Sequence, residues 1–105
     1  MAKSKYGNKQ TVLNGKVFDS RREARRFMEL DLMQKAGLIS DLRLQVPFEL
    51  IPKIGSERAV YYIADYVYKE NGETVVEDCK GCRTDVYRIK RKLMLYRYGI
   101  EIKET

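Results

Sequence analysis

The chain has 105 residues, the size of one domain. Its 21 Lys and Arg residues exceed its 15 Asp and Glu residues, and the formal net charge of +6 suits a polyanionic partner, with nucleic acid as the first candidate. No apolar run reaches the ~20 residues of a membrane-spanning helix, and the basic N-terminus lacks the apolar stretch of a secretory signal. We therefore expect a protein of the cytoplasm, in a bacterium or an infected host cell.

The first third of the chain is expected to form an arm, a short hairpin and a helix. Residues 1–10 are basic and predict a mobile arm, and residues 11–105 then form a single domain. Residues 11–18 contain Asn-Gly, a strong signal for a hairpin turn. A helix follows from about Ser20, because apolar residues recur at helical spacing until Gly37.

Glu23 has two interpretations. Ser20-x-x-Glu23 is a capping-box pattern, in which the Glu23 carboxylate accepts the backbone N–H of Ser20. Alternatively, Glu23 lies one turn before Phe27, on or beside the buried face, where its carboxylate can take part in a site. Glu29 competes for that second role, and spacing alone leaves the choice open.

The next segment predicts one strand and a turn. Apolar and polar residues alternate through residues 41–50, which is typical of a strand with one buried face. Pro47 favours an edge position or a bulge, because proline cannot donate a ladder hydrogen bond. Residues 52–58 are expected to form a turn.

Residues 61–82 carry the most informative pattern. Runs rich in Val, Ile and Tyr flank Asn71-Gly72, so we predict a second hairpin. A two-residue loop pairs Glu70 with Glu73, and this register places Asp65 directly opposite Asp78.

Alternation divides this hairpin into two faces. The face with the two Asp residues also holds Tyr61, Ile63, Val67, Val76 and Lys80, and the other face holds Tyr62, Ala64, Tyr66, Tyr68, Val75, Glu77 and Cys79. Two carboxylates roughly 5 Å apart at Cβ repel each other and need a compensating charge. Lys80 can supply one, and a divalent metal ion would supply more. The alternative is a solvated surface patch with a salt bridge from Lys80, but the apolar neighbours on this face argue against full exposure.

Cys79 and Cys82 form an isolated C-x-x-C motif. A zinc site needs four ligands, and the chain has no His and no further Cys. A redox motif needs a thiol at a helix N-terminus, but Cys79 falls within a strand. We interpret the pair as small buried side chains.

The chain ends with a helix and a short strand. Thr84 or Asp85 caps the helix, Gly99 ends it, and residues 100–103 form the strand. The predicted apolar stripe of this helix consists of Val86, Ile89, Leu93 and Tyr96.

Basic residues gather beside both helices. The candidates for nucleic-acid contacts are Arg22, Arg26, Arg83, Arg88, Arg91 and Lys92. The alternative is that each belongs to a solvated helix face. Together, however, they flank the acidic hairpin, as phosphodiester chemistry requires.

An Asp on one strand followed by Asp-x-Lys on the next resembles the PD-(D/E)xK nuclease superfamily. Asp65 matches its first acidic residue, Asp78-Cys79-Lys80 matches its second half, and Ala64 stands where the motif has proline. The chain also resembles a group of small phage and prophage proteins that share FDS-x-x-EA and the ending YGIEI, over most of residues 6–103. The expected α/β (α+β) domain, with a mixed central sheet and the core order αβββαβ, is similar to the restriction-endonuclease-like core.

The resemblance implies a metal-dependent DNA endonuclease, of the Holliday junction resolvase kind or acting on other structured DNA. Asp65 and Asp78 would hold Mg²⁺ or Mn²⁺, helped by Glu23, which matches the FDS-x-x-EA position, and by the Cys79 carbonyl. Lys80 would be the catalytic lysine. A domain this small needs a second copy to cut both strands, which suggests a homodimer.

Two readings compete with the enzyme. One is a non-enzymatic nucleic-acid-binding phage protein on a nuclease-like scaffold, and the other is a structural protein with a chance acidic hairpin. The presence of Glu23, Asp65, Asp78 and Lys80 together favours the enzyme.

Overall fold

The computed structural model describes residues 11–13, 16–18, 20–79 and 83–105. The expected arm, residues 1–10, lies outside the described residues, as do Lys80 and Cys82. The elements are β1 (Thr11–Leu13), β2 (Lys16–Phe18), α1 (Arg21–Lys35), β3 (Ser40–Ile51), β4 (Val60–Glu70), β5 (Glu73–Asp78), α2 (Asp85–Tyr98) and β6 (Lys103–Glu104).

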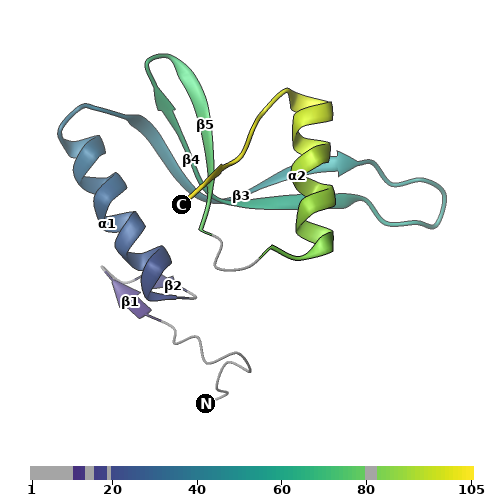
Figure 1. Cartoon of the computed structure of the whole chain (residues 1–105), viewed down its shortest axis with the longest axis horizontal. Coiled ribbons are helices and arrows are strands. Elements are labelled where there is room, and N and C mark those ends of the chain that lie inside the picture. The colour runs from purple at the N-terminus through teal and green to yellow at the C-terminus, as the bar shows by residue number, and fades with distance from the viewer. Residues whose placement is uncertain (1–10, 14–15, 19, 80–82) are drawn as a thin grey trace.

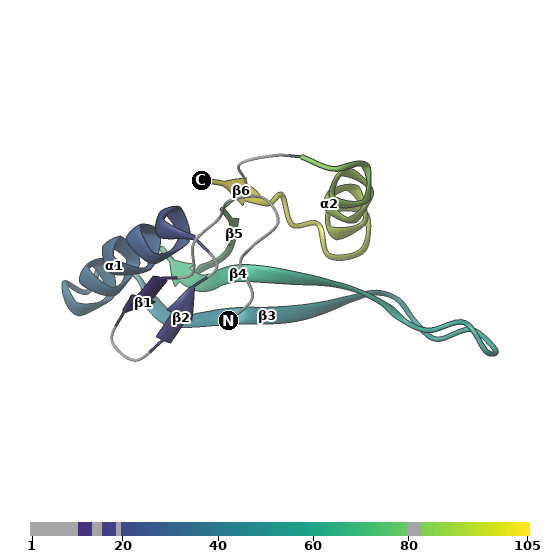
Figure 2. The same ribbon diagram turned by 90° about the horizontal axis from the view of Figure 1, so that it is seen from below.

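The main sheet has four strands in the order β3-β4-β5-β6. The pairs β3–β4 and β4–β5 are antiparallel and β5–β6 is parallel, so the sheet is mixed, and β1 and β2 form a separate hairpin beside α1 (Figures 1 and 2). The predicted small α+β domain and its αβββαβ order are confirmed. β3 is an edge strand, as Pro47 indicated.

Each helix packs over its own half of the β3–β4 hairpin and forms a separate core (Figure 1). The core under α1 contains Phe18, Ala24, Phe27, Leu30, Ile39, Tyr66 and Tyr68. The core under α2 contains Leu50, Tyr62, Ala64, Val67, Val76, Tyr87, Met94 and Ile102. The middle of β4, which contributes side chains to both, therefore lies between the two cores.

The predicted alternation along β4 is wrong before Asp65. Tyr62 and Ala64 pack under α2 together with Val67, whereas Tyr66 and Tyr68 pack under α1. The side chains that face α2 thus change phase between Ala64 and Val67. In the partner strand, Gln45 has φ 53, outside the strand region, and this local break in the backbone accompanies the change.

Capping residues explain where both helices begin and where α2 ends. The Ser20 hydroxyl caps α1 by accepting the Glu23 N–H at 3.2 Å, and the Thr84 hydroxyl caps α2 by accepting the Tyr87 N–H at 3.1 Å. α2 ends at Gly99, whose φ of 66 is easily adopted only without a side chain.

The predicted apolar stripe of α2 is wrong. Val86, Ile89 and Tyr96 are 61, 61 and 87% exposed, and the fully buried residues are Tyr87 and Met94. Those two are seven apart and form an equally regular helical line. The periodicity did not decide between the two lines because α2 has large apolar residues on both faces.

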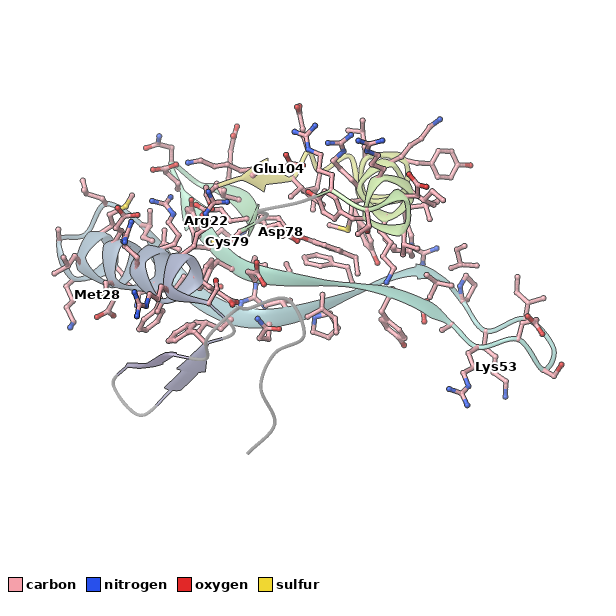
Figure 3. The ribbon with its side chains drawn as sticks, turned by 60° about the horizontal axis from the view of Figure 1, so that its bottom comes forward. Arg22, Met28, Lys53, Asp78, Cys79 and Glu104 are labelled. Carbon is pink, nitrogen blue, oxygen red and sulfur yellow. The ribbon has the colours of Figure 1, made fainter. Side chains whose placement is uncertain are left out.

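The β3–β4 hairpin projects beyond α2 as an arm (Figure 2). Its tip is closed by two hydrogen bonds between Ile54 and Glu57, of 2.9 and 3.1 Å, so the turn predicted at residues 52–58 is present. Figure 3 shows Lys53 near this end, far from the ends of β5 and β6.

A buried ion pair joins α1 to β5. Arg26 donates from Nε to Glu77 Oε1 at 2.8 Å and from its terminal nitrogen to Oε2 at 2.7 Å, and the Tyr68 hydroxyl donates to the same carboxylate. Glu77 is fully buried and the Arg26 side chain is only 18% exposed. Burial alone would raise the pKa of Glu77, but the hydrogen bonds from Arg26 and Tyr68 outweigh it and hold that pKa below its usual range. Arg26, one of the candidates for nucleic-acid contact, thus joins α1 to the sheet through both nitrogens of its pair with Glu77.

We expect Arg26→Met to reduce the free energy of unfolding by about 3–5 kcal/mol, because it leaves a buried carboxylate without its cation. Urea denaturation followed by circular dichroism measures this loss. The control is Arg25→Met on the exposed side of the same helix, which should change stability by less than about 0.5 kcal/mol. Equal effects of the two changes would contradict the assignment.

The ion pair also sets the sign of the pH dependence. Because the pKa of Glu77 is lowered in the folded protein, its stabilisation is complete above the ordinary value of 4.5 and is lost as the pH falls through the folded value. Without Arg26, burial raises the pKa of Glu77 in the folded variant. Acidification therefore lowers the free energy of unfolding of the variant less than that of the wild type. The stability difference between wild type and Arg26→Met should therefore shrink between about pH 7 and about pH 4. A difference that stays constant with pH would show that Arg26 does not set the pKa of Glu77.

Candidate functional site

The central hairpin has the predicted register. Five pairs, from Glu70↔Glu73 to Tyr66↔Glu77, follow it, and the turn residues Asn71 and Gly72 have φ 53 and 79. The ladder ends at Tyr66↔Glu77, one position before Asp65 and Asp78. The two carboxylates thus belong to adjoining strand positions where the regular pairing stops.

Beyond the last ladder pair, the Asp65 carboxylate joins β4 to the end of β5. Oδ2 accepts the backbone N–H of Cys79 at 2.8 Å, and Oδ1 accepts Nε2 of Gln45 at 3.4 Å. The side chain therefore bridges the outer strand β3 and the end of β5. Its orientation is fixed from both sides.

Glu23 accepts a hydrogen bond from the same Gln45 side-chain amide, from its position on α1. It is 6% exposed, and its Oε1 accepts Gln45 Nε2 at 3.3 Å. The Tyr66 hydroxyl donates to the Glu23 carbonyl oxygen at 2.5 Å and holds this first turn of the helix against the sheet. One amide nitrogen thus lies between two carboxylate oxygens from residues 42 apart in sequence.

Gln45 was not identified from the sequence. Its polar position in an alternating strand looks like an ordinary solvent-facing residue. The register of β3 on β4, with Leu44↔Tyr66 and Val46↔Ala64, brings it level with Asp65. That register depends on contacts between strands and cannot be read from either strand alone.

Asp78 has a different environment. Its carboxylate is buried, and Oδ2 accepts the Tyr62 hydroxyl at 2.6 Å. Burial raises the pKa of Tyr62, and the hydrogen bond to Asp78 and the charges of Asp78 and Asp65 raise it further. Tyr62 therefore remains a protonated donor. Figure 3 shows Asp78 and Cys79 together at the end of β5, where Glu104 of β6 lies beside them.

The predicted ligands are only partly brought together. Glu23 and Asp65 converge on Gln45, and the Cys79 backbone contacts Asp65, but Asp78 meets Tyr62 on the α2 side. Within the described part of the chain, no three Asp, Glu or Cys side chains are grouped closely enough to hold one metal ion. Carboxylates remain the donors that Mg²⁺ prefers, and the Gln45 N–H₂ group occupies the position between two of them that a cation favours.

Cys79 behaves as a packed thiol. It is a free cysteine, half-buried against the α1 core, and its Sγ lies 3.3 Å from Thr105 Oγ1. Burial raises the pKa of this thiol, which disfavours the reactive thiolate. For Cys79 this agrees with the interpretation as a small packed side chain.

Four of the six predicted nucleic-acid contacts line one cavity. Arg83, Arg88, Arg91 and Lys92 border a cavity of about 600 Å³ between α2 and the C-terminal segment. Arg22, which Figure 3 labels, is exposed in the first turn of α1, and it precedes Glu23 in the sequence. No helix in the described ranges is both long and apolar enough to cross a membrane.

A family profile described as a protein of unknown function (DUF1064) matches residues 3–105, so the chain belongs to that family. No curated protein matches the chain, and neither does any solved structure.

We expect Mg²⁺ or Mn²⁺ to stabilise the folded protein through these carboxylates. Metal at about 100 times its Kd would add about 2.7 kcal/mol by mass action, and EDTA should reverse the shift in Tm. Asp65→Asn and Glu23→Gln should remove most of this shift, because they replace anionic ligands with neutral amides.

The matched control is Asp41→Asn, at an exposed position of β3 whose carboxylate lies 3.8 Å from Arg43 Nε. This variant should keep the full metal-dependent shift in thermal melts. A wild-type protein whose Tm does not respond to either metal would contradict the site.

Proposed function

We propose that this member of the DUF1064 family is a metal-dependent DNA endonuclease. The observation that carries the proposal is the convergence of Glu23 and Asp65 on one amide nitrogen. Two carboxylates that separate elements hold around one hydrogen-bond donor provide oxygen ligands of the kind that Mg²⁺ and Mn²⁺ bind. Asp78 follows the last pair of the β4–β5 ladder and is the third acidic group within this region.

Glu23 and Asp65 would hold the metal, with the Cys79 carbonyl as a further ligand, and Asp78 would join them by turning from the Tyr62 hydroxyl toward Asp65. A bound Mg²⁺ or Mn²⁺ would lower the pKa of a bound water and neutralise charge at the attacked phosphate. The chain's own groups prepare this site. The Cys79 N–H holds the Asp65 carboxylate, and the Tyr62 hydroxyl donates to the Asp78 carboxylate.

Lys80 lies outside the described residues, and its role follows from its position two residues after Asp78. Its ammonium would stabilise the negative charge that develops on the phosphate oxygens. The net charge of +6 and the basic cavity beside α2 support nucleic acid as the substrate. Branched or other structured DNA is the substrate class that we propose.

A non-enzymatic DNA-binding protein is the second candidate. It is favoured by one observation, namely that the described residues hold no group of three metal ligands. Both candidates bind DNA, so only the cleavage reaction separates them.

A cleavage assay on branched, nicked and linear DNA, with Mg²⁺, Mn²⁺ or EDTA, tests the proposal. Cleavage should require metal, and Asp65→Asn, Asp78→Asn and Lys80→Ala should each lower its rate by about 100-fold or more while DNA binding persists. Gln45→Ala should keep the wild-type rate at saturating metal, because the metal takes the place of the Gln45 amide between Glu23 and Asp65. The control Asp41→Asn should cleave like the wild type. If cleavage does not depend on metal, or if no DNA is cleaved, the endonuclease proposal is wrong and the non-enzymatic DNA-binding protein is the remaining candidate.

A further inference from the structure

A concave basic site lies between α2 and the end of the chain. The cavity of about 600 Å³ is bordered by Arg88, Arg91 and Lys92 of α2, by Arg83 just before the helix, and by residues 101–104. A volume of this size accommodates a small ligand or one nucleotide unit.

The cations of this cavity fall into two groups. Arg83 and Arg91 donate to Glu104, at 2.9 Å from Arg83 Nε and 3.1 Å from Arg91, and the Tyr87 hydroxyl donates to it at 2.7 Å. The hydrogen bond from Tyr87, joined by those from both arginines, lowers the pKa of Glu104 to about 2. Glu104 is therefore ionised at neutral pH and fixes the two guanidinium groups at the border of the cavity.

Arg88 and Lys92 form the second group. They are four residues apart on one exposed helix face, and within the described part of the chain neither forms an ion pair. The four cations outnumber the acidic residues of the lining, Glu101 and Glu104. The cavity thus carries a positive excess of two charges, which favours an anion.

The cavity adjoins the candidate catalytic site. Glu104 of β6 pairs with Asp78 of β5, and neighbouring strands are ~4.8 Å apart. Tyr62 and Tyr87 pack in the same core, the first bonded to Asp78 and the second to Glu104. A ligand in the cavity would lie one strand away from the acidic hairpin.

We propose that this cavity binds a phosphate group of the nucleic-acid strand and thereby anchors the strand beside the acidic site. Arginine forks match the geometry of phosphate oxygens, and Lys92 adds a point charge. The proposal rests on the nucleic-acid substrate of the proposed function. The phosphate has two sources, a strand terminus or the internal backbone, and the test separates them.

The test compares the double variant Arg88→Gln/Lys92→Gln with a control that loses the same charge. The control is Lys53→Gln/Arg58→Gln, at the tip of the β3–β4 hairpin. All four side chains are exposed. Binding is measured by fluorescence anisotropy in EDTA, which prevents metal-dependent cleavage, on labelled duplexes with 5′-phosphate ends, with 5′-hydroxyl ends, and with both ends closed by hairpins.

We expect the cavity variant to bind about tenfold more weakly than the control and to lose about two units of salt slope, one for each phosphate contact removed. A terminal phosphate is the ligand if the wild type prefers 5′-phosphate ends and the variant loses that preference. An internal phosphate is the ligand if the variant loses equal affinity on the closed duplex.

The inference is overturned if the cavity variant binds all three duplexes as tightly as the control variant of the β3–β4 hairpin. Because binding is measured without metal, this result is independent of cleavage. If the wild type cleaves DNA and the cavity variant binds normally, the proposed phosphate site is wrong and the proposed nuclease activity stands. If the wild type cleaves no DNA and the cavity variant binds weakly, the nuclease activity is wrong and the phosphate site stands.

Discussion

The buried ion pair between Arg26 and Glu77 fixes the position of α1 on the sheet, and the geometry of the candidate site depends on it. Glu23 lies three residues before Arg26 on the same helix, and Asp78 directly follows Glu77 on β5. The bidentate contact, with Tyr68 as a third partner, therefore determines where both acidic groups lie. A buried charge pair costs desolvation energy, so its use here favours a defined arrangement over maximal stability.

The break in regular structure at Gln45 and Asp65 is the second constraint. Gln45 has φ 53, a conformation that costs about 1–3 kcal/mol for a residue other than glycine. The compensation is local, because its side chain donates to Glu23 and Asp65 while Asp65 also accepts the Cys79 N–H. The same place divides the two cores and changes which side chains face α2. A strained residue bonded to two carboxylates supports the assignment of a functional site.

Short-range patterns predicted much of this structure. The Asn71-Gly72 turn determined the hairpin register, and the Ser20 and Thr84 hydroxyls cap the two helices as expected. The predicted pairing of Asp65 with Asp78 is absent from the ladder, which ends one position earlier, at Tyr66↔Glu77. Long-range packing could not be predicted in the same way. Arg26 looked like a solvated cation because its partner is 51 residues away, and the role of Gln45 depended on how β3 pairs with β4. The buried face of α2 depended on which of two apolar lines meets the sheet.

The account stands on the claim that the acidic groups of α1, β4 and β5 form one metal site. The most direct measurement is an anomalous-difference map from crystals of the wild-type protein grown with Mn²⁺. The account predicts a peak at the carboxylates of Asp65 and Asp78, with the Gln45 amide displaced from its position between Glu23 and Asp65. Crystals in which Mn²⁺ binds elsewhere, or in which Gln45 still joins Glu23 to Asp65 at saturating metal, would contradict it.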